Sequence, residues 1–471
     1  MERVPDRIRI GVSVAVLGAL VLAASSGAAR HPALARTAAG KATAIAAGGG
    51  HTCAVTTAGA VKCWGYNSHG QVGDGTKTDR HAPVAVSGLG SGVAGVAAGG
   101  LHTCAITRTG GVACWGANHS GQLGDGTTDD RLAPVVVSDV GSGVTEIAAG
   151  ASHTCALTGA GGVDCWGGNG NGQLGDGTTN DHHVPGGVQG LVGLAYAVAA
   201  GGAHSCAITG PQRTVVCWGA NGQGQLGDGT GLDKHMPAYA QALGEAGVVA
   251  GDAHTCTFPT GGPYLACFGA GGHGQLGYGG TANFLSPIAV VAFMQGVLAV
   301  AAGGNHTCAI TPAHGVECWG ANDHGQLGDG TTTERHQPVA VSGLTSGVAT
   351  IAAGFSHTCA LRTTGTILCW GYNGQGQLGD GTTTDRLTPV PVLGFGAALP
   401  VVCVVPKVVG RALPKARKMI VKAHCRVGKV TRKTSSRRLQ GRVLKQKPKP
   451  GRRLPKGARV NLTVGIAAKN V

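Results

Sequence analysis

The sequence predicts an all-β protein whose main part is a seven-bladed β-propeller, because one unit of about 51 residues recurs seven times. Each unit contains four short strand patterns separated by Gly, Asn, Asp and Thr, with no segment long enough for an ordinary helix. A unit of this size cannot bury both of its faces alone, so neighbouring copies must stack, and four strands per unit are typical of propeller blades. A parallel β-solenoid is the alternative, although its coils are usually shorter.

The repeat is marked by the triplet His-Thr-Cys or His-Ser-Cys, which recurs every 50 to 52 residues. A second cysteine follows ten or eleven positions later, and then come Trp-Gly and Gly-Gln-Leu-Gly-Asp-Gly-Thr or a close variant. In the first unit we expect strands at residues 43–47, 52–56, 61–65 and 83–86. The seven units together occupy residues 43–396.

The cysteine spacing fits a hairpin with a disulfide across it. If Cys53 faces Cys63 in an antiparallel pair, a three-residue loop remains, and its last residue, Gly59, must adopt a left-handed conformation. Glycine stands at this position in four units, and the sixth unit places His314 there. We therefore predict one disulfide per unit, each contributing about 2.5–3 kcal/mol through loop closure. The predicted pairs are Cys53–Cys63, Cys104–Cys114, Cys155–Cys165, Cys206–Cys217, Cys256–Cys267, Cys308–Cys318 and Cys359–Cys369.

Residues 1–35 have the features of an export signal: a basic start, an apolar run at residues 10–24 and small residues around 33–35. A linker at residues 36–42 follows. The alternative is an uncleaved membrane anchor, since the apolar run approaches the length of a membrane span. Either interpretation places the body of the protein outside the cytosol, where disulfides persist.

The charge of the chain is divided between two parts. The net charge is +15, but residues 401–471 hold 21 Lys and Arg and no Asp or Glu. The rest of the chain carries 16 basic against 22 acidic residues. This asymmetry indicates two modules with different partners.

Each unit follows the run Ala-Gly-Gly-x-His-Thr-Cys-Ala-Ile-Thr and then Val-x-Cys-Trp-Gly-x-Asn-x-x-Gly-Gln-Leu-Gly-Asp-Gly-Thr, with variations. This motif resembles the regulator of chromosome condensation repeat in its exported bacterial form, and the resemblance covers about residues 43–396. It implies a seven-bladed propeller that serves as a protein-binding platform. Some relatives are nucleotide-exchange factors for a small nuclear GTPase, and some secreted bacterial relatives bind enzymes such as β-lactamases. Exchange activity is not expected of an exported protein, because it would not meet a cytosolic GTPase.

A second linker at residues 397–402 is followed by the run Val-Val-Pro-Lys-Val-Val-Gly, an apolar stripe, and a final alternating run before the tail at 466–471. On these features, residues 403–465 are similar to the PASTA module of penicillin-binding proteins and serine/threonine kinases. This similarity implies a helix packed on a three-stranded sheet, and association with peptidoglycan. An extra pair, Cys403 and Cys425, would tie the first strand to the end of the helix. The stripe consists of Leu413, Ala416, Ile420 and Ala423.

We assign the binding of anionic wall polymers to the basic residues of this module. The phosphate backbone of nucleic acid and anionic lipid are the competing ligands, and the export signal makes nucleic acid the disfavoured one. The assigned residues are Arg437, Arg438, Lys445, Lys447, Lys449, Arg452 and Arg453.

No catalytic group, metal ligand set or cofactor site is expected. Each unit supplies one His and two Cys, which approaches a zinc set, but a fourth ligand is missing and bonded cysteines are the simpler account. The Asp-Gly-Thr loops lack the alternating oxygen ligands and closing Glu of a hand-type calcium site, so their Asp and Thr are expected to cap turns. The repeated histidines and tryptophans are expected to be structural.

The fifth unit differs most from the others. Phe268 replaces the usual Trp, Tyr278 replaces the usual Asp, and Phe284 and Leu285 form an apolar run. Sequence drift is one explanation. The alternative hypothesis is that these four residues form a partner-facing sector, since exposed apolar groups on a propeller rim often mark contacts.

The sequence therefore predicts a non-catalytic extracytoplasmic adaptor, secreted or associated with the cell wall, whose propeller binds an unknown protein partner. A secreted inhibitor of an extracellular enzyme such as a β-lactamase is the alternative. A guanine-nucleotide exchange factor would require the export signal to be non-functional.

Overall fold

The computed structural model describes residues 40–140, 143–242, 245–259, 265–395, 403–454 and 457–467. The predicted export signal, residues 36–39 of the first linker, the second linker and the end of the tail lie outside these ranges. Within them, no helix is both long enough and apolar enough to cross a membrane.

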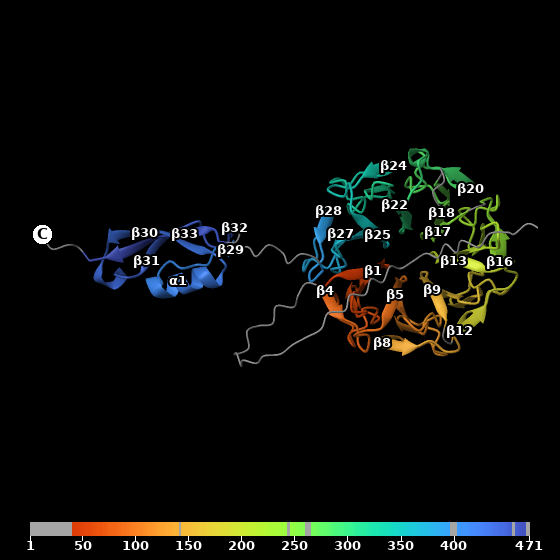
Figure 1. Cartoon of the computed structure of the whole chain (residues 1–471), viewed down its shortest axis with the longest axis horizontal. Coiled ribbons are helices and arrows are strands. Elements are labelled where there is room, and N and C mark those ends of the chain that lie inside the picture. The colour runs from red at the N-terminus through yellow and green to blue at the C-terminus, as the bar shows by residue number, and fades with distance from the viewer. Residues whose placement is uncertain are drawn as a thin grey trace, which may run out of the picture. The chain divides into compact units, whose positions relative to one another are not determined.

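Seven four-stranded sheets form the propeller, as the repeat predicts. Each sheet uses four strands that are consecutive in the chain, with the first strands, such as β1 and β9, near the centre and the fourth strands, such as β4 and β12, at the rim (Figure 1). The strands of the first four blades are β1 Ala42–Ala47, β2 His51–Thr56, β3 Val61–Gly65, β4 Arg80–Ala85, β5 Val93–Ala98, β6 His102–Thr107, β7 Val112–Gly116, β8 Arg131–Val136, β9 Val144–Ala149, β10 His153–Thr158, β11 Val163–Gly167, β12 His182–Gly187, β13 Ala195–Ala200, β14 His204–Thr209, β15 Thr214–Gly219 and β16 Lys234–Tyr239. The last three blades contain β17 Gly247–Ala250, β18 His254–Phe258, β19 Ala266–Gly269, β20 Phe284–Ala289, β21 Ala299–Ala302, β22 His306–Ile310, β23 Val316–Gly320, β24 Arg335–Ala340, β25 Val348–Ala353, β26 His357–Arg362, β27 Ile367–Gly371 and β28 Arg386–Pro391, with a 3-10 turn η1 at Val291–Phe293.

The central hairpin of each blade has the predicted register. In the first blade Cys53 pairs with Cys63, and Gly59 has a φ of 76°, the left-handed conformation that the tight loop requires. His314 adopts the same conformation in the sixth blade, with a φ of 60°. The structure joins the cysteines of every blade in the expected pairs, and no cysteine is free.

The outermost strand begins earlier than the sequence predicts. The expected strand started at Pro83, but β4 begins at Arg80, which lies opposite Gly65 of β3. Pro83 is tolerated within this strand because β4 is the edge of the sheet, where a missing N–H breaks no ladder.

Tryptophan side chains fill the space between blades. The six tryptophans and Phe268 are fully buried. Trp115 of the second blade packs against Val55, Val61 and Val72 of the first blade, and the other boundaries are built in the same way. The structural role predicted for the tryptophans is therefore confirmed.

The ring closes without exchange of strands. The first and seventh blades are each formed by one contiguous segment, and β1 lies beside β25 (Figure 1). Trp64 of the first blade packs against Leu361 and Ile367 of the seventh. In addition, the N–H of Gly40 donates to the carbonyl of Gly394 at 2.9 Å. Side-chain packing and hydrogen bonds therefore close the ring.

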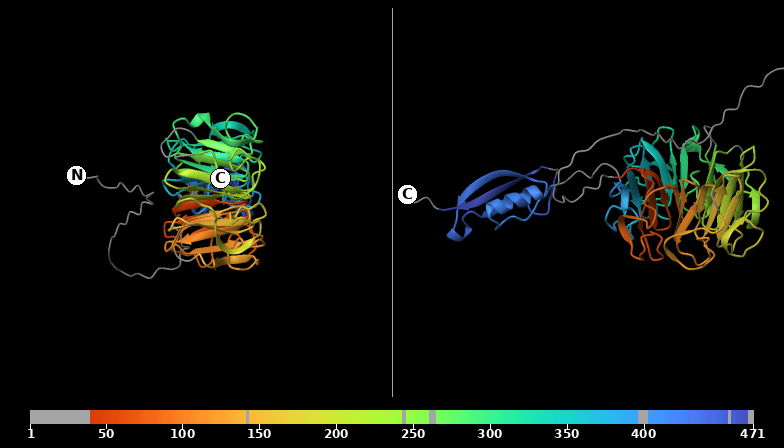
Figure 2. Two further views of the ribbon diagram at one scale, coloured as in Figure 1. Left: turned by 90° about the vertical axis from the view of Figure 1, so that its right-hand side faces the viewer. Right: turned by 60° about the horizontal axis from the view of Figure 1, so that its bottom comes forward.

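The C-terminal module contains one helix on a three-stranded sheet, as the PASTA resemblance implies, and both appear in the right-hand view of Figure 2. In the sheet, β33 is central, parallel to β30 and antiparallel to β31. Ala416 and Ile420 of the helix are fully buried against Val460 and Leu462 of the sheet. A disulfide joins Cys403 to Cys425, the predicted pair. The elements are β29 Cys403–Val404, α1 Leu413–Lys422, β30 Arg426–Thr434, η2 Arg437–Leu439, β31 Val443–Lys447, β32 Arg453–Leu454 and β33 Arg459–Ile466.

Candidate functional site

A closed ring of seven buried histidines links neighbouring blades. His51 Nε2 of the first blade lies 2.8 Å from Thr103 Oγ1 of the second. The Thr103 hydroxyl donates to the backbone carbonyl of Gln71 at 2.9 Å, and Trp115 Nε1 donates to the same carbonyl at 2.9 Å. The His-to-hydroxyl bond recurs at every blade boundary: His102–Thr154, His153–Ser205, His204–Thr255, His254–Thr307, His306–Thr358 and, at the closure, His357–Thr52.

This geometry determines the protonation of the imidazoles. Thr103 donates its hydroxyl proton to the Gln71 carbonyl, so its oxygen can only accept a hydrogen bond from His51. His51 Nε2 is therefore the protonated nitrogen of that imidazole. Burial lowers the pKa of His51 to about 4. Burial, together with repulsion from His153 and His51, lowers the pKa of His102 to about 3. The ring is therefore uncharged at neutral pH.

The neighbouring glycines make room for these rings. A Cβ atom added to Gly48 would lie 2.5 Å from the imidazole of His51 and 2.4 Å from the carbonyl oxygen of Gly99. Such a contact requires the backbone or the imidazole to shift. The Ala-Gly segment and the histidine of each repeat are therefore a single structural device, as the structural interpretation of the histidines predicts.

The Asp-Gly-Thr loops are closed by their own side chains. Asp74 Oδ1 accepts hydrogen bonds from the N–H and hydroxyl of Thr76, and Oδ2 accepts one from Arg80 Nε at 2.5 Å. Burial acts to raise the pKa of Asp74, but the hydrogen bonds from Thr76 and Arg80 outweigh it and hold that pKa below its usual value. Because its carboxylate oxygens already have these partners, the turn-capping interpretation is preferred over a calcium loop.

Backbone lines the central channel. The Ala-Gly-x segments of the seven blades, in which x is Gly in four blades, surround a cavity of about 170 Å³. Ala151, Asp252 and Phe355 take the place of this glycine in the other three blades, and of these only Asp252 and Phe355 are larger than alanine. Burial raises the pKa of Asp252. The channel thus has a distinct polar point and a distinct apolar point within a wall that is otherwise repetitive.

A second cavity, of about 490 Å³, adjoins the channel at the first, second and seventh blades. Its lining includes the side chains of Tyr66, Leu101, Phe355, Tyr372 and Gln375, and we call it the aromatic mouth. Phe355 is 51% exposed. The two tyrosines follow Trp-Gly, where the other five units have Ala or Gly. That departure from the repeat is a signal that the sequence interpretation missed, and an exposed aromatic cavity of this kind is suited to protein contact.

The hypothesis of a partner-facing sector in the fifth blade is wrong for Phe268. This side chain is 0% exposed, because it takes the place of Trp in the core between two blades. Tyr278 and Phe284 are half-buried and pack edge to face, with ring centroids 4.9 Å apart, and Tyr278 Oη accepts a hydrogen bond from the N–H of Ala282 at 2.6 Å. Leu285, at 42% exposure, is the one residue of the four that is mainly on the surface.

The C-terminal sheet presents a basic face on the side away from its helix. Alternation along the strands directs Val460, Leu462 and Val464 toward the helix and leaves the intervening side chains for the opposite face. A groove of about 260 Å³ runs across this face. It is lined by Lys429, Thr431, Lys445, Lys447, Asn461 and Thr463, and also by Gln446 and Leu462, whose side chains are buried; we call it the lysine groove.

The structure separates the predicted wall-binding residues into three groups. Lys445 and Lys447 line the lysine groove, where Lys429 joins them from β30. Arg437 and Arg438 are exposed on η2. The others are in the segment after β31, where Lys449 and Arg452 are exposed and the side chain of Arg453 lies outside the described part. The sequence interpretation missed Lys429, which the structure places at an exposed position of β30.

A seven-bladed propeller whose repeated polar side chains bond blade to blade, and whose variable aromatic side chains gather at the channel mouth, defines the class of β-propeller binding proteins. Comparison with known families gives the particular one: the chain belongs to the Regulator of chromosome condensation (RCC1) repeat family. The family model matches residues 58–106, 109–157, 160–208, 267–310, 316–361 and 364–405. The PASTA domain model matches residues 404–466.

Curated relatives support this membership. The chain is 34% identical over 353 residues to the ultraviolet-B receptor UVR8 of Arabidopsis thaliana, covering 73% of this chain and 80% of that protein. It is 30% identical over 329 residues to the E3 ubiquitin-protein ligase HERC2 of Homo sapiens, covering 69% of this chain but only 6% of HERC2.

Solved structures share the fold. Human WBSCR16 aligns with a TM-score of 0.64 at 23% identity, over 72% of this chain and 94% of that one. Prp20p of Saccharomyces cerevisiae, described with its binding to Gsp1p and histones, aligns with a TM-score of 0.63 at 20% identity, over 75% of this chain and 87% of that one. At these identities the likeness concerns architecture alone.

Proposed function

We propose that this protein is an extracytoplasmic, non-catalytic adaptor whose lysine groove holds it on anionic cell-wall polymer while its propeller binds a protein partner. The observation that carries the proposal is the concentration of lysines on one sheet face of a PASTA domain that contains no Asp or Glu. The disulfides support an oxidising compartment, because all sixteen cysteines are paired.

The lysine groove offers both charge and hydrogen-bonding groups. Lys445 lies opposite Thr463 in the strand register, and Lys447 lies opposite Asn461. The hydroxyls of Thr431 and Thr463, both in the lining of the groove, are 3.1 Å apart. Ammonium groups around a strip of hydroxyl and amide groups suit a polymer that carries carboxylates or phosphates and sugar hydroxyls.

A charge-matched pair of variants tests the lysine groove. One variant combines Lys429→Glu, Lys445→Glu and Lys447→Glu. The control reverses three exposed lysines of α1: Lys415→Glu, Lys418→Glu and Lys422→Glu. Both variants have the same net charge, so a loss of sedimentation with purified cell wall in the groove variant alone supports the proposal. Equal loss of sedimentation in both variants would show that the interaction depends on net charge alone. No loss in either variant would refute the proposal.

Fractionation tests the adaptor role. We expect the protein in the wall fraction, from which salt releases it, because Coulomb attraction between exposed charges is screened by ions. Protein found free in the medium and inhibiting an extracellular hydrolase would instead support the inhibitor alternative.

We assign partner contact on the propeller to the aromatic mouth. A photo-crosslinking residue in place of Phe355 should give a discrete covalent adduct in living cells, because this side chain is half exposed within an apolar cavity. The matched control places the same residue at Leu285, which is similarly exposed on the fifth blade. Adducts from position 285 and none from position 355 would contradict the assignment.

A further inference from the structure

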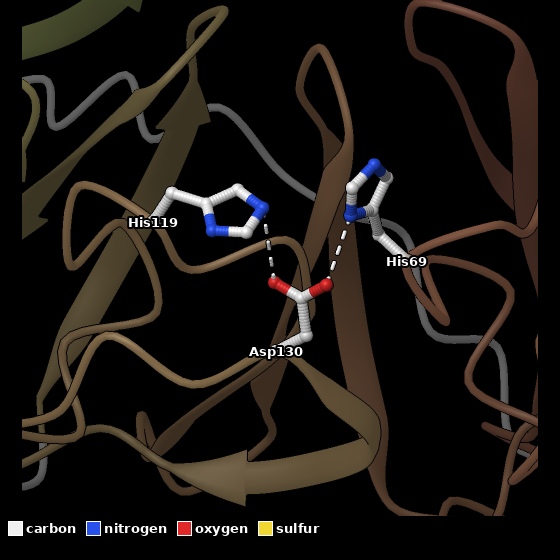
Figure 3. A group of neighbouring side chains, drawn as sticks. All are labelled: His69, His119 and Asp130. Carbon is white, nitrogen blue, oxygen red and sulfur yellow. Dashed lines mark hydrogen bonds and ion pairs between the residues drawn. The ribbon is translucent and has the colours of Figure 1, made fainter.

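Two imidazoles and a carboxylate meet between the first and second blades, outside the surfaces described above (Figure 3). His69 lies in the loop after β3, while His119 and Asp130 lie in the loop between β7 and β8. His69 Nδ1 is 2.9 Å from Asp130 Oδ2, and His119 Nε2 is 3.7 Å from Asp130 Oδ1. One donor atom from each of the three residues lies within 4.8 Å of the other two.

The repeat shows what is special about this cluster. Two other boundaries carry the same His-to-carboxylate contact: His273 with Glu334 at 2.6 Å, and His324 with Asp385 at 2.8 Å. At the latter boundary, Gly374 stands at the position equivalent to His119. Glu334 also has a second imidazole, His336 Nε2, at 3.9 Å from its other oxygen. Among the residues that the structure describes, however, three such donor atoms lie within 4.8 Å of one another only at the first boundary.

From this geometry we infer that His69, His119 and Asp130 bind a divalent transition-metal ion such as Zn²⁺. Two imidazole nitrogens and a carboxylate oxygen are a preferred Zn²⁺ donor set, and tetrahedral bonds of about 2.0–2.1 Å separate the donor atoms by about 3.3 Å. The His69 Nδ1–Asp130 Oδ2 distance of 2.9 Å is close to that separation, and His119, now 3.7 Å from Oδ1, would turn toward the same oxygen as His69. The ion would replace the hydrogen bond between His69 and Asp130, and it would join the first blade to the second.

Neighbouring groups fix the orientation of the Asp130 carboxylate, whereas the His119 imidazole is largely exposed and can move. The side chain of Asp130 is 14% exposed, and its Oδ1 accepts a hydrogen bond from the N–H of Asn118 at 3.0 Å. This contact orients Oδ2 toward His69, as a supporting hydrogen bond does for metal-binding carboxylates. The side chain of His119 is 71% exposed, so it can rotate into the coordination sphere at little cost in packing. The fourth position of a tetrahedral site would face solvent and take water or a group from a partner.

Metal titration of the full-length, untagged protein tests the site. We expect one equivalent of Zn²⁺ by calorimetry and, with Co²⁺ as the probe, the intense visible absorption of a tetrahedral complex. His119→Ala should lower Zn²⁺ affinity by more than about tenfold, the loss that even supporting partners of a metal ligand produce. Asp130→Asn should do the same.

The control is His324→Ala, which removes an imidazole from the equivalent pair that lacks the third ligand. It should leave the stoichiometry and affinity unchanged. Tryptophan fluorescence confirms that each variant is folded, since the six indoles are buried in the propeller. Unchanged Zn²⁺ affinity in folded His119→Ala, or wild-type protein that binds no Zn²⁺ and gives no tetrahedral Co²⁺ spectrum, would overturn the inference.

Discussion

Acidification from pH 7.5 to pH 5.5 should destabilise the propeller through its histidine ring. Burial lowers the pKa of His51 to about 4 and that of His204 to about 3, from an ordinary value of 6.5, and the other five are lowered to about 3 or 4. A base whose pKa is lower in the folded state binds protons on unfolding. Its contribution to stability is therefore complete above pH 6.5 and is lost progressively as the pH falls from there toward 4.

The size of the effect follows from the number of imidazoles. At pH 5.5 an unfolded histidine is about 90% protonated, so seven histidines take up about 6 protons on unfolding. Integration over these two pH units gives a loss of about 9 kcal/mol in the free energy of unfolding. Domains are typically stable by about 5–15 kcal/mol, so the loss is decisive.

Buried carboxylates act in the opposite direction in this window. Burial raises the pKa of Glu146 and that of Glu245 to about 7, so each releases a proton on unfolding at pH 5.5, and together they offset less than half of the loss. The Asp-Gly-Thr carboxylates, such as Asp74, have lowered pKa values, and their stabilisation is lost only below about pH 4. The expected net uptake at pH 5.5 is about 5 protons.

Denaturant titration with the disulfides intact measures this prediction. Tryptophan fluorescence reports on the propeller, because all six tryptophans lie in its core. His204→Gln should lower stability at pH 7.5 and reduce the proton uptake by about one. The matched control is His235→Gln, an exposed histidine on β16, which should leave the slope unchanged. Stability that does not change between pH 7.5 and 5.5, or a slope unaltered by His204→Gln, would refute the reasoning.

Three further predictions concern the packing of the ring. Trp218→Ala removes a fully buried indole between two blades and should cost about 3–5 kcal/mol of unfolding free energy; a cost below 1 kcal/mol in a denaturant titration would contradict the core assignment. Replacing Cys206 and Cys217 together by serine opens a loop closed over 11 residues and should cost about 3 kcal/mol, measured against wild type under non-reducing conditions. Gly48→Ala should destabilise by about 1–3 kcal/mol because its Cβ meets backbone and imidazole at 2.4–2.5 Å, whereas Gly90→Ala, with nothing within 4 Å, should be neutral or slightly stabilising; equal melting temperatures for the two variants would show the close approach to be unimportant.

Much of the fold was predictable because its determinants are close together in the chain. Cys53 and Cys63 are ten residues apart, and their register follows from the length of the loop that joins two alternating strands. The sevenfold period then required stacked blades, whatever the details of their contacts. The helix of the PASTA domain was likewise visible in a stripe of apolar residues, of which Ala416 and Ile420 are fully buried.

The functional features depend on contacts between residues about one repeat or more apart, and local patterns do not contain them. His69 and Asp130 are 61 residues apart, and Tyr66 and Phe355 share a cavity only because the last blade returns to the first. Phe268 shows the reverse case, since its departure from the repeat looked like a surface feature and proved to be core. Strand pairing and hairpin register depend on residues close together in the chain and can therefore be predicted from the sequence. Which loops of neighbouring blades meet is decided by the curvature of the closed ring, which only the tertiary structure shows.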